Sequence, residues 1–176
     1  MKRLFGVLSI LASTVLLSSC LFGGGRFFRD SDEKIAKNRM EQVLDALVRK
    51  DKEALKSMFS KTALAEAEDF ENRMDYLFNF FQGEVKPWKD DDRNSGPAVH
   101  EHNDHGHVTK EFTYWYYIDT DKESYLFFIV DYVEDTDHPD NVGLYTLRAI
   151  RAEDRETEFT NSLYMKIPGI YKPTKT

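Results

Sequence analysis

The sequence predicts an α+β domain in which three N-terminal helices pack on a curved antiparallel sheet. Two observations predict this class. Apolar residues recur at helical spacing as far as Gly83, and runs with strand-like alternation or continuous apolar character follow it. Helices in one half of a chain and strands in the other half are typical of α+β folds. We find no internal repeat, and the length suits a single domain.

The helical half contains three predicted helices. The first runs from Asp32 to Arg49, a short second helix follows, and the third ends near Phe81, just before Gly83, a residue type common beyond a helix C-terminus. Residues suited to N-capping precede the three starts: Asp30 and Ser31 for the first, Asp51 for the second, and Ser60 or Thr62 for the third. The third helix carries an apolar stripe that must dock on the sheet: Ala67, Phe70, Met74, Leu77, Phe78 and Phe81.

The strand half contains two long predicted strands with different patterns. The run from Val108 to Ile118 alternates, which places Phe112, Tyr114, Tyr116 and Ile118 on one face. The run from Tyr125 to Val133 is nearly all apolar, which indicates a central strand covered on both faces. The remaining predicted segments are a short edge strand at 84–88, a polar loop at 89–97, a strand at 142–151, and a last strand or packed tail at 165–171.

The N-terminal segment that ends at Cys20 has the three parts of an export signal. Lys2 and Arg3 precede a mostly apolar run from Leu4 to Leu17. This run is marginal for a membrane span, which needs about 20 apolar residues. It ends in Leu17-Ser18-Ser19-Cys20, which resembles the lipobox of bacterial lipoproteins. The resemblance implies lipid on Cys20 and cleavage before it; an ordinary signal peptide or an uncleaved anchor is the alternative.

These features divide the chain into a signal peptide at 1–19, a lipidated cysteine with a flexible tether at 20–30, and one folded domain at 31–176. Cys20 is the only cysteine, so the only thiol in the sequence is the one that would be lipidated. Cleavage also removes two of the 24 basic residues, so the charge becomes (24 − 2) − 31 = −9. A field of that sign repels nucleic acid, which we exclude as a partner. The predicted location is the extracytoplasmic face of the cell membrane.

The layout resembles the cone-shaped fold of the nuclear transport factor 2 and scytalone dehydratase group, in which helices and a strongly bent sheet enclose a pocket. Four phrases are more specific: Lys50 to Ser60, Tyr76 to Gly83, Asn141 to Tyr145, and Lys166 to Tyr171. They resemble an uncharacterised family of Gram-positive lipoproteins, the domain of unknown function 5104, over roughly Lys34 to Pro173. The resemblance implies a fold and a cellular address, and it implies no activity.

A histidine-rich segment, which is not part of that family pattern, is the candidate metal site. It contains His100, His102, His105 and His107. If 98–102 and 107–118 pair as a hairpin around Asn103-Asp104, each strand presents its histidines on one face. Two to four imidazoles can then converge on Zn²⁺ or Cu²⁺. The alternative is a solvated loop whose metal binding is weak and non-structural.

Asp131 is the candidate catalytic acid. It shares a strand face with Tyr125, Phe127, Ile129 and Val133. An apolar wall raises the pKa of a carboxyl group, which can then act as a general base. The alternative is a structural Asp131 that accepts hydrogen bonds or pairs with a neighbouring cation. The sequence contains no nucleophile elbow, phosphate-binding glycine loop, dinucleotide fingerprint or Cys-x-x-Cys pair.

The leading functional hypothesis is a membrane-anchored binding lipoprotein without catalytic activity. It would present a pocket or sheet surface to a small molecule or to another envelope protein. One alternative is a small pocket enzyme of the hydrolase, dehydratase or isomerase type that uses Asp131. Another is a metal-capture protein that uses the histidine segment. The sequence predicts no cofactor, apart from Zn²⁺ under the last hypothesis.

Overall fold

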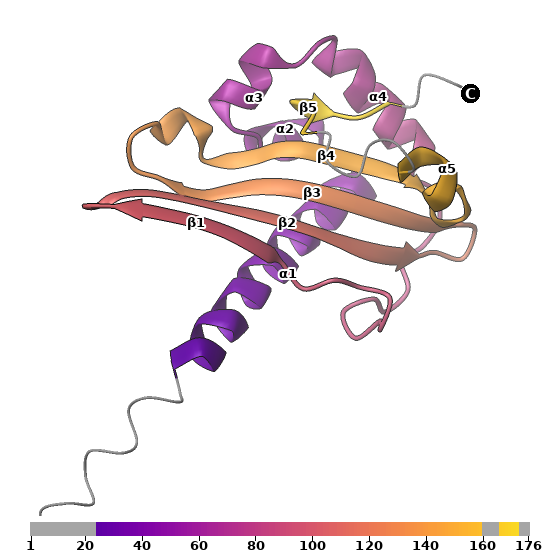
Figure 1. The fold of residues 1–176 in the computed structure, drawn as a ribbon. Helices are drawn as coiled ribbons and strands as arrows, with labels where there is room; N and C mark the ends of the chain where they lie inside the picture. The colour runs from indigo at the N-terminus through magenta and orange to yellow at the C-terminus, as the bar shows by residue number, and fades with distance from the viewer. Residues whose placement is uncertain (1–23, 160–165, 173–176) are drawn as a thin grey trace, which may run out of the picture.

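The computed structural model describes residues 24–159 and 166–172, with side-chain detail from Ser31 onward. The signal peptide predicted at 1–19 and the lipidation site predicted at Cys20 lie outside these residues. Within them the chain is α+β, as predicted, and a helical half precedes a five-stranded sheet (Figure 1). The helices of the first half are α1 (Gly24–Arg49), α2 (Lys52–Ser57), α3 (Lys61–Glu66) and α4 (Phe70–Phe80).

The sheet is a meander in which sequence neighbours are also spatial neighbours. Its strands are β1 (Ala98–Asp104), β2 (His107–Asp119), β3 (Ser124–Asp135), β4 (Gly143–Arg151) and β5 (Gly169–Ile170). The first four pair antiparallel, whereas β5 pairs parallel to β4, so the prediction of a wholly antiparallel sheet is wrong at this edge. A tight turn after β4 would reverse the chain and make the next strand antiparallel. The connection from β4 to β5 is longer and includes the helix α5 (Arg155–Phe159), so β5 runs in the same direction as β4.

The predicted third helix is in fact two helices, so the prediction of three N-terminal helices is wrong. The chain leaves helical geometry between Ala67 and Asp69, and Asp69 has a left-handed φ of 52°. Gly169 of β5 lies against this break, because a Cβ atom on Gly169 would be 2.7 Å from the Cβ of Ala67. The break therefore coincides with the passage of the C-terminal tail toward β4.

The helix starts follow the predicted caps at two of three places. The Asp51 side chain accepts a hydrogen bond from the Ala54 backbone N–H at 2.9 Å, and Ser60 accepts one from Ala63 at 3.0 Å. The predicted caps Asp30 and Ser31 are wrong, because α1 is already helical from Gly24. The part of the predicted tether from Gly24 onward is thus in this helix.

The histidine segment forms the hairpin of β1 and β2 and not a loop. Asp104 pairs with His107, so the two-residue turn consists of His105 and Gly106 and not of the predicted Asn103-Asp104. Both turn residues have positive φ, 53° and 95°. This backbone matches a type I′ turn, whose twist suits a two-residue hairpin. The predicted edge strand at 84–88 is reduced to a single bridge between Val85 and Thr120.

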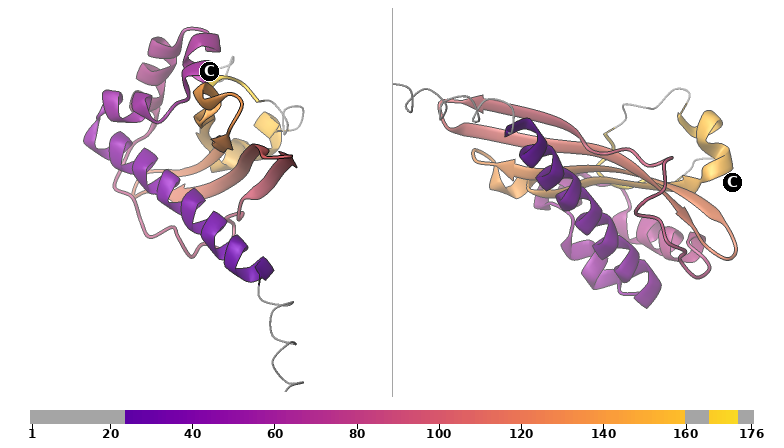
Figure 2. Two further views of the ribbon diagram at one scale, coloured as in Figure 1. Left: turned by 90° about the vertical axis from the view of Figure 1, so that its left-hand side faces the viewer. Right: turned by 90° about the horizontal axis from the view of Figure 1, so that it is seen from below.

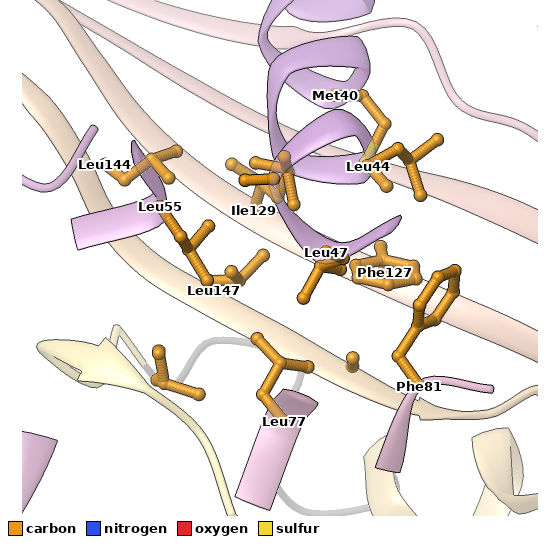
Figure 3. Close-up of a cluster of buried hydrophobic side chains, with 14 of the residues drawn as sticks. Met40, Leu44, Leu47, Leu55, Leu77, Phe81, Phe127, Ile129, Leu144 and Leu147 are labelled. Atoms are coloured by element: carbon orange, nitrogen blue, oxygen red, sulfur yellow. The ribbon is translucent and has the colours of Figure 1, made fainter. Parts of the chain in front are cut away.

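The main core lies between the helices and one face of the sheet. In Figure 2, α1 crosses this face obliquely, and its N-terminal end projects away from the rest of the domain. Figure 3 shows the interlocked side chains of the helices and strands: Met40, Leu44, Leu47, Leu55, Leu77, Phe81, Phe127, Ile129, Leu144 and Leu147. The predicted apolar face of β2 is confirmed, because Phe112, Tyr114, Tyr116 and Ile118 are all buried there.

The opposite face of the sheet carries a smaller apolar cluster. Phe128 and Val130 of β3 pack there with Phe159 of α5. The prediction that the central strand is covered on both faces is therefore confirmed. None of the helices in the described part of the chain combines the length and apolar character of a membrane span.

Candidate functional site

Asp131 lies on the sheet face that α1 covers, and its side chain is 0% exposed. Its Oδ2 accepts a hydrogen bond from Nε of Arg39, on α1, at 2.9 Å. The Arg39 side chain is 24% exposed, so the guanidinium reaches the carboxylate from the rim of the domain. This is the arrangement of the structural alternative, in which Asp131 pairs with a neighbouring cation.

The surroundings of Asp131 nevertheless retain features of a general base. Burial raises the pKa of the Asp131 carboxyl, while the charge and the hydrogen bond of Arg39 oppose that rise. Burial and the nearby Asp131 hold the pKa of the Tyr114 hydroxyl well above its usual value. A contact with the Tyr114 hydroxyl also acts on the Asp131 carboxyl and lowers its pKa. By strict hydrogen-bond geometry, Asp131 Oδ1 and the hydroxyls of Tyr114 and Tyr116 are buried without a partner among the described atoms. A buried oxygen without a hydrogen-bond partner costs free energy and requires an explanation. In this structure, α1 lies between the Asp131 carboxyl and solvent.

A polar groove lies on the other face of the sheet, over β1, β2 and β3. It has a volume of about 380 Å³ and is lined by Val99, His100, Glu101, His102, Thr109, Glu111 and Tyr132. Glu111 is only 6% exposed, and its carboxylate forms an ion pair with Lys166. Burial and the Glu111 charge raise the pKa of the Tyr132 hydroxyl to about 12. We refer to this feature as the outer groove.

The four candidate metal ligands are separated into two groups. His100 and His102 both line the outer groove. His105 occupies the hairpin turn and contacts Asp104, and the Nδ1 of His107 lies 2.6 Å from a carboxylate oxygen of Asp137. Within residues 24–159 and 166–172, no three His, Cys, Asp or Glu side chains lie together in a way that could hold a metal ion. The four histidines therefore do not form the shared site that the sequence suggested as one possibility.

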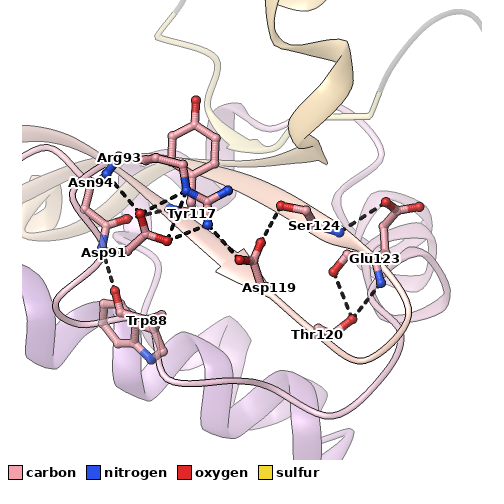
Figure 4. Close-up of polar contacts among 9 residues, drawn as sticks. All are labelled: Trp88, Asp91, Arg93, Asn94, Tyr117, Asp119, Thr120, Glu123 and Ser124. Carbon is pink, nitrogen blue, oxygen red and sulfur yellow. Dashed lines mark hydrogen bonds and ion pairs between the residues drawn. The ribbon is translucent and has the colours of Figure 1, made fainter.

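The segment between Trp88 and Ser95 is tied to β2 by a polar network (Figure 4). Arg93 pairs with Asp91 and Asp119 and lies over the Tyr117 ring, 4.7 Å from its centroid. Hydrogen bonds from Ser124 and Arg93 lower the pKa of Asp119. These bonds fix the chain just before β1.

Residues 42–152 match the profile of a family described as "Domain of unknown function (DUF5104)". The chain belongs to this family. No curated protein matches the sequence. The matched range of the DUF5104 domain runs from within α1 to just past β4. It includes Asp131 and all four hairpin histidines, whereas Arg39 precedes it.

Sequence reasoning missed three charged residues that shape the two sites of this DUF5104 protein. Arg39 had a signal, because it lies at helical spacing from the buried Ala36 and Val43 and therefore faces the sheet. Glu111 had a weaker one, since it interrupts a strand otherwise rich in aromatic residues. Lys166 had none, because its contact with Glu111 joins segments that are 55 residues apart.

Proposed function

We propose that this protein is a lipid-anchored lipoprotein on the extracytoplasmic face of a bacterial membrane, with a domain that binds a ligand or an envelope protein and has no catalytic activity. The main support for this proposal is the contrast between the two sites. The outer groove is open and polar, and it contains the buried Glu111. The one deeply buried acid that sequence reasoning selected, Asp131, is paired with Arg39 beneath α1.

The domain would be a cone of the nuclear transport factor 2 type, in which α1 to α4 cover one sheet face. Support comes from the helical half packed on a single face and from the order of helices before strands. The anchor rests on the Leu17-Ser18-Ser19-Cys20 motif. Because α1 begins at Gly24 and its N-terminal end projects from the domain, the helix would act as a stalk between the lipid and the sheet (Figure 1).

The anchor predicts that Cys20→Ala blocks lipidation and lipid anchoring. The variant lacks the thiol that accepts the diacylglyceryl group. We therefore expect no lipidation and no globomycin-sensitive cleavage of the signal peptide. Membrane fractionation and intact-mass measurement, with Ser19→Ala beside it as a matched control, would measure this. Wild-type fractionation and processing of Cys20→Ala would contradict the proposal.

The binding role predicts that a photo-crosslinking amino acid in the outer groove captures the physiological ligand. Thr109 is a suitable position, because it lines the groove and is half-buried. Val48 on α1, which is 57% exposed, is the matched control position. After irradiation of intact native host cells, we expect a discrete adduct in the intact mass from Thr109 and none from Val48. The same adducts from both positions, or none from Thr109, would contradict a binding role for the groove.

A pocket enzyme remains the second candidate, and one observation favours it. The Asp131 carboxyl lies beside the Tyr114 hydroxyl in a buried setting, and burial raises the pKa of Asp131. A carboxyl group with a raised pKa beside tyrosine hydroxyls can transfer a proton to or from a small substrate. Such chemistry requires that α1 move to admit the substrate.

A further inference from the structure

Two histidines of the outer groove are placed to act together. His100 and His102 alternate along β1, so their side chains project from the same face of the strand. Both are exposed. Two residues along a strand separate such side chains by about 6.6–6.8 Å at their Cα atoms. Imidazole nitrogens bind Zn²⁺ at about 2.0–2.1 Å, so two flexible rings at this spacing can reach one ion.

The other two histidines of the hairpin each contact a carboxylate through Nδ1. The His105 ring contacts Asp104 in the turn, where the strand pairing ends. The Nδ1 of His107 lies 2.6 Å from Asp137, in the loop after β3. Of the four histidines, His100 and His102 are the two that line the outer groove, a distinction that the sequence spacing does not make.

One buried carboxylate lies beside the pair. Glu111 lines the same groove, directly across the β1–β2 ladder from His100, and is paired with Lys166, so it is not counted as a ligand. Glu101 alternates with the two histidines along β1 and lies 3.8 Å from Lys110, which also contacts Asp32 of α1, so its carboxylate lies toward the other face. With two protein ligands, the remaining coordination positions are open to water or to a donor atom of a bound molecule.

We propose that His100 and His102 chelate one divalent transition-metal ion on the outer face of the sheet. The inference rests on the proposed role of the outer groove as the binding surface, and it adds the ligand class. Imidazole pairs of this kind take Cu²⁺, Ni²⁺ and Zn²⁺, with Cu²⁺ bound most tightly. The ion would not support the fold, because both side chains project from an edge strand into solvent.

Titration of the mature full-length lipoprotein in detergent, prepared without a histidine tag, tests the site. Calorimetry with Cu²⁺ and with Zn²⁺ would measure affinity, and electron paramagnetic resonance would count the nitrogen ligands of Cu²⁺. We expect two equatorial nitrogens and at least a tenfold loss of affinity in His100→Ala and in His102→Ala. The matched controls His105→Ala and His107→Ala should bind within about twofold of the wild type, and all four should melt like it.

Full affinity in the His100→Ala/His102→Ala double variant would overturn the site. An equal loss in His105→Ala or His107→Ala would overturn it as well, because a different set of ligands would then be at work. The crosslinking from Thr109 is scored separately. Adducts from Thr109 without metal binding refute the metal site alone, whereas metal binding without adducts refutes the wider binding role.

Discussion

Phe78→Ala is expected to lower the free energy of unfolding by about 3–5 kcal/mol. Phe78 lies on α4, is 5% exposed, and belongs to the core between the helices and the sheet. Its removal leaves a cavity that the surrounding core cannot fill without moving. Because a domain of this size is stable by about 5–15 kcal/mol in total, the loss should be evident in both thermal and urea unfolding.

Asn79→Ala is the matched control, because Asn79 is the next residue of the same helix and is exposed. A substitution of this kind should change stability by no more than about 0.5 kcal/mol. The hydrogen bond that Lys50 donates to the Phe78 carbonyl at 2.7 Å involves the backbone and survives the Phe78 change. An unchanged melt for Phe78→Ala would disprove the docking of α4 on the sheet.

Local patterns were sufficient to predict most of the elements. The alternation in β2 and the continuous apolar run in β3 predicted the faces that the structure shows, because strand side chains alternate whatever the rest of the chain does. The division between α3 and α4 was not predictable in this way. It coincides with the contact between Ala67 and Gly169, which joins two distant segments and leaves no periodic trace near Ala67.

The candidate site shows the same division between local and distant information. The apolar neighbours of Asp131 along β3 indicated which face it occupies, and the structure places it there in full burial. Its partner is 92 residues away on α1, so no local pattern specified whether the acid was free or paired. The histidines were recognised from spacing alone. Their separation into two groups depends on the hairpin turn at His105-Gly106 and on Asp137 beyond β3.

Arg39→Met is expected to destabilise the protein at neutral pH by about 3 kcal/mol, because it leaves the Asp131 carboxylate buried without a counter-charge. We take the lower end of the usual range, since the Arg39 side chain is 24% exposed and the pair is partly solvated. Methionine retains much of the length and the helix propensity of arginine, so the change acts mainly on charge. Urea unfolding at several pH values would measure it. Lys37→Met, on the same helix, removes only a partly exposed ion pair with Glu33; it is the control and should have an effect below about 1 kcal/mol.

The pH dependence of that loss has a definite sign. The pKa of Asp131 is already raised from 3.8 by burial, and removal of Arg39 takes away the interaction that opposes the rise. A carboxyl group whose folded pKa exceeds its unfolded pKa loses stability as pH rises between the two values. The Arg39→Met defect should therefore be small near pH 4 and grow toward pH 7.

Arg39→Met/Asp131→Asn should recover most of the stability, because it buries neither charge. An equal defect at both pH values, or no recovery in the double variant, would refute the structural role of the pair. A folded Asp131→Asn protein that loses a turnover measured in the wild type would favour the pocket enzyme instead.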